Sequence, residues 1–329
     1  MILTSGVVDE VLHRPGPEHY TSRFNSWDRR SSVRTKPRRL FPEFGGDDQV
    51  FFPPEFVPVL KHPDVAARGP EVRRRLLIHA LYQYLHFTVI LEQTAVLPVT
   101  AQISVGRSGI SLPPAMRHDA FKITTDEAWH AQFSHDFIQE IARATGVRPL
   151  AVAEPEFVNK LSSVREEFEP AARALADLFF TIVSETLVSA LLAEIPNDRR
   201  LPVPVRALVG DHAEDEGKHH AYFRSFLHFL WPRLSPAERR LIGPRVPDFV
   251  RIFLQPDLSS VIRALRSTGF GEQQAAGIVA DCYPRGRRHD RLRDAARWTV
   301  QAFREIGSLD DRLVYDSFLS AGLIDECNN

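Results

Sequence analysis

A run of histidines and carboxylates inside an apolar helical pattern, extending from Val203 to Leu230, is the feature that most constrains how this chain can fold. His212, Glu216 and His219 follow one another at steps of four and three residues, so all three lie in one narrow stripe of a helix. The same stripe is apolar on both sides. Its apolar members are Val205, Leu208, Phe223, Phe226 and Leu230. We expect the two imidazoles and the carboxylate to point into a core, where a shared cation would satisfy them.

Two other helical segments each carry a single glutamate on an apolar face. The first begins after Gly69 and carries Glu92, and Pro98 is expected to kink or end its regular part. The second is predicted over residues 170–195 and carries Glu185, which is the only charge in its apolar stretch. A surface glutamate would normally have polar neighbours on the same face. Both residues are therefore candidates for buried, functional carboxylates.

The remaining long helix is predicted from about residue 115 to Gly146 and carries Glu127 and His130 on its inner stripe. These two residues form a Glu-x-x-His pair, and Glu216 and His219 form another. One glutamate from each of two helices and one Glu-x-x-His pair from each of two more make the ligand set of a carboxylate-bridged di-metal site in a ferritin-like four-helix bundle. Any one motif alone is weak evidence, but the four together predict that site.

The order of these motifs is repeated along the chain, which predicts two helix pairs related by a pseudo-twofold axis. In both Glu-x-x-His pairs an aspartate comes directly before the glutamate, namely Asp126 and Asp215. An aspartate at this position can reach across the bundle and accept the second N–H of a metal-binding histidine. We expect Asp126 to serve His219 and Asp215 to serve His130.

The predicted fold is therefore all-α, a ferritin-like four-helix bundle with additional N-terminal and C-terminal helices in a single domain. Residues 1–70 are expected to form a covering segment, residues 71–231 the four-helix metal-binding core, and residues 232–329 the C-terminal helices that close a pocket over it. The covering segment is locally basic, and we expect its charges to be solvated. They are Arg29, Arg30, Arg34, Lys36, Arg38 and Arg39.

Composition and charge exclude several classes of binding partner and cofactor. A formal net charge of -1 gives no electrostatic footprint for nucleic acid or an anionic membrane. The only cysteines, Cys282 and Cys327, exclude a disulfide scaffold and a cysteine-ligated cluster and fit a reducing cytoplasm. No signal peptide is expected, and the apolar stretches that contain Glu92 and Glu185 predict core helices rather than membrane spans. Because no flavin or nicotinamide motif is present either, redox chemistry would need an external electron donor.

At these positions the sequence resembles the diiron N-oxygenases, typified by the p-aminobenzoate N-oxygenase of aureothin biosynthesis and the arylamine oxygenase of chloramphenicol biosynthesis. The resemblance covers residues 76–230 and includes His212, because a third histidine one turn before the last glutamate distinguishes this family from ferritins and completes the coordination of one iron. It implies a homodimeric enzyme with two Fe ions (Fe2+/Fe3+) per chain. The implied reaction uses O2 to convert an aryl or heteroaryl amine through hydroxylamine and nitroso to a nitro product in natural-product biosynthesis.

The substrate pocket is less well defined by the sequence. Its expected walls are Tyr84, Thr88, Val89 and Phe253. In the p-aminobenzoate enzyme an arginine C-terminal to the bundle holds the substrate carboxylate. The candidates for such a residue here are Arg291, Arg293 and Arg297. Core packing and a solvated arginine face would explain the same residues, so which amine is bound, and whether it carries a carboxylate, stays open.

Other functions share parts of this pattern. A diiron C–H hydroxylase or desaturase would use six of the seven ligands, and an iron-binding ferritin-like protein would hold metal without organic chemistry. A dimetal hydrolase is less favoured, because a buried bundle offers no evident wet cleft. The sequence also leaves open whether oxidation stops at the hydroxylamine, nitroso or nitro stage, and which reductant is used.

Overall fold

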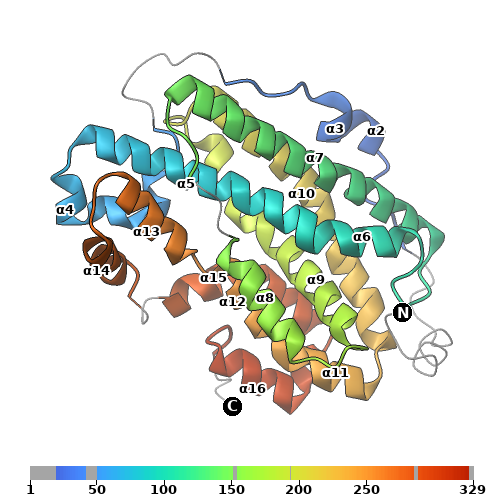
Figure 1. The fold of residues 1–329 in the computed structure, drawn as a ribbon. Helices are drawn as coiled ribbons and strands as arrows, with labels where there is room; N and C mark the ends of the chain where they lie inside the picture. Colours follow the sequence, from blue (N-terminus) through green and yellow to red (C-terminus); the bar gives the residue numbers. More distant parts are fainter. Residues whose placement is uncertain (1–19, 42–49, 151–153, 193, 285–287, 326–329) are drawn as a thin grey trace.

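The computed structural model describes residues 20–41, 50–150, 154–192, 194–284 and 288–325, and these residues contain helices and no strand (Figure 1). This confirms the all-α prediction. Four long helical segments form the body of the molecule. They are α5 (Pro70–Leu91) continued through η3 (Glu92–Val96) into α6 (Leu97–Ser104), α7 (Pro114–Thr145), α9 (Arg173–Leu192) and α10 (Val203–Leu230).

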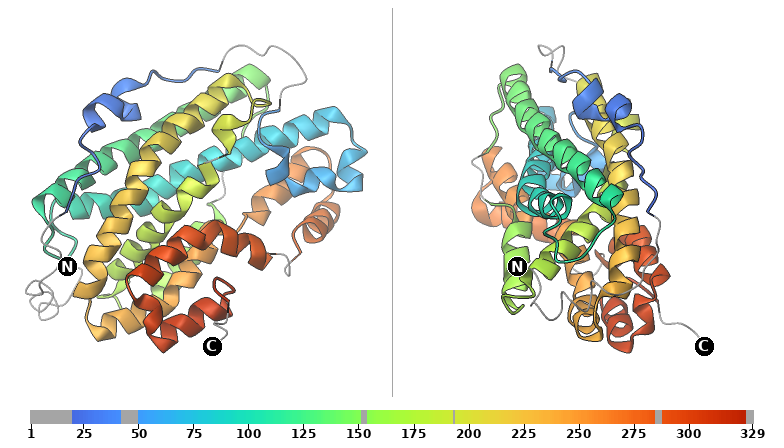
Figure 2. Two further views of the ribbon diagram at one scale, coloured as in Figure 1. Left: turned by 180° about the vertical axis from the view of Figure 1, so that it is seen from behind. Right: turned by 90° about the vertical axis from the view of Figure 1, so that its right-hand side faces the viewer.

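The four segments associate as two pairs. The continuous α5–α6 segment packs along α7, and α9 packs along α10 (Figures 1 and 2). Residues of the two pairs then meet face to face in a single core rich in fully buried aromatic side chains. This pairing is the one that the repeated order of sequence motifs predicts.

The ends of the helices coincide closely with prolines and glycines in the sequence. Proline occupies the first turn of α5, α7 and α10, where its missing N–H has no helical partner to lose. α7 ends at Gly146, whose φ of 70° is the left-handed conformation that glycine adopts at low cost. The predicted start of α9 at Pro170 is three residues early, because residues 170–172 form a turn before the helix begins at Arg173.

The predicted kink near Pro98 has a different cause. The segment η3 is a π turn that starts at Glu92, in which the N–H of Leu97 bonds to the carbonyl of Glu92 five residues earlier. The Thr181 hydroxyl, from α9, donates to the carbonyl of Ala95 within this turn at 3.1 Å. Pro98 itself lies in the first turn of α6, where it is tolerated.

Shorter elements surround the bundle. Those outside the C-terminal region are α2 (Trp27–Arg30), α3 (Ser32–Thr35), η1 (Pro54–Phe56), η2 (Pro58–Lys61), α4 (Pro63–Ala66), α8 (Glu156–Glu166) and η4 (Ile195–Asn197). The C-terminal elements are η5 (Trp231–Arg233), α11 (Pro236–Ile242), η6 (Gly243–Arg245), α12 (Val246–Leu254), α13 (Leu258–Ser267), α14 (Glu272–Cys282), α15 (Arg288–Glu305), η8 (Ser308–Asp310) and α16 (Arg312–Ser320). Within them α12 and α15 pack against α9, whereas α13 packs against α5. Among the described residues, none of the helices combines the length and apolarity needed to cross a bilayer.

Candidate metal centre

The seven side chains singled out by their spacing meet in the middle of the bundle, and each is at most 2% exposed. They come from all four helical segments. The set consists of Glu92, Glu127, His130, Glu185, His212, Glu216 and His219. Three overlapping subsets place their possible ligand atoms within 4.8 Å of one another, and together the subsets include all seven residues. A cluster of oxygen and nitrogen donors with shared members is the arrangement that two neighbouring metal ions require.

Glu216 occupies the centre of the cluster. Its Oε1 atom lies 3.1 Å from His212 Nε2, 3.3 Å from His130 Nδ1 and 3.4 Å from His219 Nδ1. Glu127 is the second hub, because Oε1 lies 2.7 Å from His219 Nδ1 and Oε2 lies 3.0 Å from His130 Nδ1. Both histidines of the Glu-x-x-His pairs thus direct Nδ1 toward the carboxylates.

Several of the possible metal-binding atoms have no hydrogen-bond partner in the described part of the chain. They are Glu92 Oε2, Glu185 Oε2 and Glu216 Oε2. Glu127 Oε1 and His219 Nδ1 lie 2.7 Å apart but likewise lack a hydrogen bond of normal geometry. An unsatisfied buried carboxylate oxygen is costly, and several together in one place are uncommon in proteins. Hard oxygen donors with a few imidazoles suit iron or manganese, so the orphaned atoms fit a pair of such cations.

The electrostatics of the cluster point the same way. Burial and the neighbouring carboxylates of Glu127 and Glu216 raise the pKa of both Glu92 and Glu185 well above the usual range. Burial alone would lower the pKa of His219, but the adjacent carboxylates of Glu127 and Glu216 raise it well above its usual value. Without metal the cluster must therefore hold protons, and bound cations would replace them.

The outer nitrogen of each pair histidine faces an aspartate from the opposite half of the bundle. His219 Nε2 lies 3.3 Å from Asp126 Oδ2, and His130 Nε2 lies 3.5 Å from Asp215 Oδ2. The structure thus places both aspartates opposite the histidines expected from the sequence. Each carboxylate can accept the Nε2–H proton and thereby leave Nδ1 unprotonated and free to bind a cation.

The N-terminal segment adds contacts that the sequence did not predict. The Trp27 indole N–H donates to Asp126 Oδ1 and Oδ2 at 2.9 and 2.8 Å, and the Ser31 hydroxyl donates to Asp126 Oδ1 at 3.0 Å. The backbone N–H of Ser32 donates to Asp215 Oδ2, also at 3.0 Å. The junction of α2 and α3 therefore holds both aspartates in place. No periodicity or motif marks these residues, so only a three-dimensional structure could reveal them.

Most of the basic residues of the same segment are exposed to solvent, as expected, and four of them also form ion pairs. Arg30 and Lys36 each lie 3.2 Å from a carboxylate oxygen of Glu214, on the outer face of α10. Arg39 Nε donates to Asp211 Oδ2 at 2.7 Å, and Arg38 Nη2 donates to Glu140 Oε1 at 2.9 Å. Charge complementarity thus fixes this segment across α7 and α10, on the histidine side of the centre.

A cavity of about 670 Å³ lies between α5, α7, α8, α12 and α13. Three of the four expected pocket residues, Tyr84, Val89 and Phe253, line it. Thr88 does not line it; this side chain is buried, and its hydroxyl donates to the carbonyl of Tyr84 in its own helix. The cavity therefore combines wall residues of the bundle with a wall residue from the C-terminal helices.

Two of the three arginines considered as substrate anchors, Arg293 and Arg297, do not line this cavity. The side chain of Arg291 lies outside the described residues. Arg293 forms an ion pair with Asp325, and the Arg297 guanidinium lies over the ring of Trp298 at 5.0 Å. The latter two are therefore engaged on the surface of the C-terminal region.

Tyr84 connects the cavity to the metal centre. Its ring lines the cavity, and its hydroxyl is buried without a hydrogen bond of normal geometry in the described part of the chain. Burial, together with the nearby carboxylates of Glu216 and Glu92, raises the pKa of this phenol far above its usual value. The hydroxyl therefore stays protonated, with the Thr88 side chain beside it and the carboxylates of Glu216 and Glu92 nearby.

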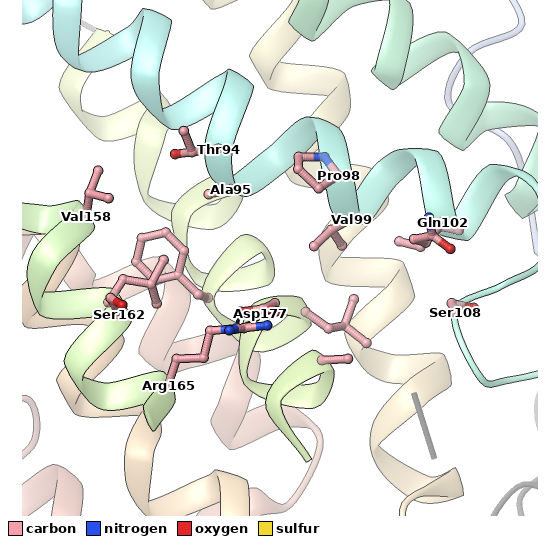
Figure 3. A pocket seen from close by; sticks show the side chains of 15 residues that line it. Thr94, Ala95, Pro98, Val99, Gln102, Ser108, Val158, Ser162, Arg165 and Asp177 are labelled. Atoms are coloured by element: carbon pink, nitrogen blue, oxygen red, sulfur yellow. Dashed lines mark hydrogen bonds and ion pairs between the residues drawn. The ribbon is translucent and has the colours of Figure 1, made fainter. Parts of the chain in front are cut away.

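A second, smaller cavity of about 360 Å³ lies beside η3 and α6 (Figure 3). It is lined by Thr94 and Ala95 of η3 and by residues of α6, α8 and α9. The charged residues in its wall are Arg165 and Asp177, whose side chains face each other across α8 and α9 in Figure 3. Arg165 Nε donates to both oxygens of Asp177, at 2.9 and 3.0 Å, so this pair is internally satisfied.

A family model described as P-aminobenzoate N-oxygenase AurF matches residues 27–307. The chain belongs to this family. The 4-aminobenzoate N-oxygenase of Streptomyces thioluteus is 26% identical over 268 residues, which cover 78% of this chain and 76% of that protein. Membership confirms the resemblance inferred from the seven spaced residues and shows that the chain is an oxygenase. The match extends from the N-terminal segment that contacts Asp126 to the C-terminal helices around the larger cavity.

Proposed function

We propose that the chain is a non-haem diiron N-oxygenase that uses O2 to oxidise an aryl or heteroaryl amine through hydroxylamine and nitroso to a nitro product. The observation that carries this proposal is the convergence of four buried glutamates and three histidines in one cluster with orphaned donor atoms. The family match supports amine oxidation in particular.

In this proposal the seven residues of the cluster hold two irons, with Glu127 and Glu216 closest to both sets of histidines. When bound, the irons supply O2 binding and the redox equivalents for oxygen insertion. Asp126 and Asp215 hold the outer N–H of His219 and His130, which fixes both rings and increases their basicity. His212 adds a third nitrogen donor, and burial lowers its pKa, so its imidazole is neutral and can bind metal.

The larger cavity would hold the amine. Phe87, Phe157 and Phe253 give it an aromatic wall that packs against an aryl ring and excludes water from the reacting nitrogen. The Tyr84 hydroxyl at the inner end can donate a hydrogen bond to the nitrogen lone pair or to an oxygen already added to it. The C-terminal helices would thus complete the substrate site above the metal-binding core.

The reaction needs electrons from outside the chain, because the sequence holds no flavin, nicotinamide or cluster motif. We propose an external donor and, by analogy with the family resemblance, a homodimer with two irons in each chain. Elemental analysis of protein produced with ample iron tests the metal count. Light scattering on the same sample tests the assembly.

The decisive experiment uses iron-loaded, chemically reduced protein mixed with O2 and a panel of aromatic and heteroaromatic amines. Mass spectrometry should detect products that gain oxygen on nitrogen, and Glu216→Ala protein should form none. Products hydroxylated or desaturated at carbon would instead show a C–H oxygenase. Oxidation of iron with every amine left unchanged would show an iron-binding protein.

A further inference from the structure

The larger cavity is much bigger than a single aromatic ring needs. A void of about 150 Å³ is enough for benzene, whereas this cavity measures about 670 Å³. Pockets of this size usually hold drug-sized ligands. The volume therefore suits an aromatic amine with a substantial further group attached to its ring.

The cavity is also elongated along one helix. Its wall includes residues of α5 from His79 to Val89, and Glu92 follows three residues after Val89. The ten-residue separation between His79 and Val89 corresponds to about 15 Å at the rise per residue of an α-helix. Val89 and Tyr84 lie at the end of the cavity near the candidate metal centre, so His79 lies at the remote end. A ligand that fills the cavity must extend lengthwise away from the cluster.

The helix α13 runs beside the remote half of α5. Gln83 donates to the carbonyl of Asp257, and the Ser267 hydroxyl lies 3.1 Å from His79 Nε2, so α13 is held against α5 at both of its ends. Arg263 lies in α13 between these two contacts, and it lines the cavity. It is the only arginine among the described lining residues.

Arg263 has donor capacity to spare. Its Nη2 atom donates to the Ser260 hydroxyl at 2.6 Å, and the structure gives its guanidinium no other hydrogen bond within the described ranges. The nearby carboxylate of Asp257 is already bound by the backbone N–H and the hydroxyl of Ser260. Its neighbour Glu156 is bound by Lys160 and Ser259. The remaining N–H groups of Arg263 can therefore serve a ligand.

A further polar atom between the two ends lacks a partner. His86 Nε2 is buried and forms no hydrogen bond with any residue that the structure describes, and its side chain lines the cavity between Gln83 and Val89. Together with the Tyr84 hydroxyl, it gives the cavity two orphaned polar atoms along one wall. By contrast, the arginine in the smaller cavity is tied to Asp177 on both oxygens (Figure 3).

From these observations we infer that the substrate is an elongated arylamine. Its amine ring lies against Tyr84, Phe87 and Phe253, and a substituent carrying a hydrogen-bond acceptor reaches Arg263 at the remote end. Arg263 is thus the specificity-determining residue for substrate length. This inference rests on the proposed function, which places the amine at the inner end of the cavity.

The test compares two probes that share one ring chemistry. The short probe is para-aminobenzamide, and the long probe is the same amide with an acetamidopropyl chain on its nitrogen. Iron-loaded protein should bind the long probe about tenfold more tightly in calorimetry, as one added charge-assisted hydrogen bond would give. In turnover the gain should appear in KM, with kcat similar for both probes.

Variants assign the effect to the cavity. Arg263→Gln should remove the advantage of the long probe and leave the short probe unchanged, whereas Arg165→Gln, in the smaller cavity, should change neither. Ala80→Phe, which fills the remote end beside His79, should weaken the long probe alone. Ala174→Phe is the matched control in the smaller cavity.

Calorimetry separates this inference from the proposed function. If neither probe is oxidised at nitrogen, the proposed function fails, while the order of the dissociation constants still tests the length of the site. Equal affinity for both probes, or a long-probe advantage that survives Arg263→Gln, would overturn the inference.

Discussion

The two halves of the bundle have the same design but differ at three places. Each half contributes a lone glutamate, a Glu-x-x-His pair and an aspartate directed at the histidine of the other half. However, α10 carries His212 four residues before Glu216, whereas α7 carries the apolar Ile123 four residues before Glu127. In addition, a π turn begins at Glu92 in the first half, but α9 continues as a regular α-helix through Glu185.

The third difference lies in the surroundings. Both cavities adjoin the first-half helix, with Val89 in the larger and Ala95 in the smaller. The extra nitrogen donor is supplied by the second half, whereas the N-terminal segment covers the histidine helices of both halves. The comparison teaches that a symmetric set of candidate ligands has been specialised, with both cavities beside the lone-glutamate helix of the first half and the additional histidine in the second.

The largest expected effect comes from the carboxylate with the most histidine contacts. Glu216→Ala should reduce iron affinity by more than about a hundredfold. Removing a residue that only supports a ligand typically lowers metal affinity by about ten- to a hundredfold, and removing a ligand itself should lower it further. Glu127→Ala should have a smaller effect, because Glu127 contacts two histidines rather than three. Glu214→Ala, on the outer face of the same helix, is the control. Iron titration of the three variants checks this order. Equal losses of iron affinity in Glu216→Ala and Glu127→Ala would mean that the two glutamates contribute equally to iron binding.

The second prediction concerns Glu92 and Glu185, which hold equivalent places in the two halves. Their raised pKa values mean that the folded metal-free protein keeps protons which the unfolded chain releases above about pH 4.3. The free energy of unfolding of the metal-free protein should therefore fall as pH rises above about 6.5, by up to about 1.4 kcal/mol per pH unit for each carboxyl. Below that pH the lowered pKa values of His79, His86, His212 and His220 act in the opposite direction.

His130 and His219 act in the same direction above about pH 6.5, since their pKa values are raised as well. Chemical denaturation at a series of pH values measures the slope. Glu92→Gln and Glu185→Gln should each flatten it. In iron-loaded protein the stabilisation by metal should grow over the same range, because iron binds the deprotonated ligands. A flat profile for metal-free protein between about pH 7 and 8, where the histidines with lowered pKa no longer contribute, would contradict the raised pKa values of the cluster.

The third prediction removes the difference at His212. His212→Ala should retain most of the iron but lower the N-oxygenated product per iron by roughly tenfold or more. If His212 only hydrogen-bonds Glu216, the variant should lose about 1–3 kcal/mol of stability and keep its activity per iron. Iron content, melting temperature and product yield on one preparation decide between these outcomes.

A second variant asks whether the halves are interchangeable. Adding Ile123→His to His212→Ala puts the third histidine in the first half. Because the π turn at Glu92 makes that half different, activity should not return. Recovery would mean that only the number of nitrogen donors matters.

The fourth prediction compares the two aspartates. Asp126→Asn and Asp215→Asn should each lower iron affinity by about tenfold to a hundredfold, because an amide presents a donor to groups that are themselves donors. Asp119→Asn is the matched control. Asp119 is a buried aspartate of α7 that bonds to Tyr20 and Lys122, so its loss should affect stability but not iron binding. Competition with a coloured chelator measures all three.

The smallest expected effect belongs to the N-terminal segment. Trp27→Phe removes the indole donor to Asp126 and should cost about 1 kcal/mol of stability, with only a few-fold loss of iron affinity. Trp298→Phe, at an exposed position, should be neutral. Thermal unfolding checks both, and an iron affinity as low as that of Asp126→Asn would show that Trp27 controls the aspartate.

The metal-binding core could be predicted from the sequence because burying a charge is expensive. Glu92 and Glu185 stand out on apolar stripes, since a carboxylate persists there only with a partner. Proline and glycine fixed the ends of α7 and α10 for equally local reasons. These features depend on residues within one helical turn of each other, so they can be recognised in the sequence alone.

The remaining features depend on contacts between distant segments. The bond from Trp27 to Asp126 and the bond from Ser32 to Asp215 join residues far apart in the sequence, and neither carries a periodic pattern. The same limit explains Thr88, which was expected in the pocket because it lies one turn from Glu92. Its hydroxyl bonds to its own helix, as threonine often does. Arg263 was missed because α13 meets α5 only in the folded chain.

The π turn at Glu92 also has a consequence for how this helix can change. A π turn holds one residue more than the α-helical turn it replaces, so residues on its two sides are out of step by about 100° of rotation. Deleting the additional residue of η3 would therefore leave a regular α-helix in which α6 still faces α7. By contrast, if the turn became α-helical with all its residues kept, α6 would rotate by about 100° relative to α5, and the face that now packs on α7 would point elsewhere. The directions of Glu92 and α6 are thus matched to each other only while this turn keeps its π geometry.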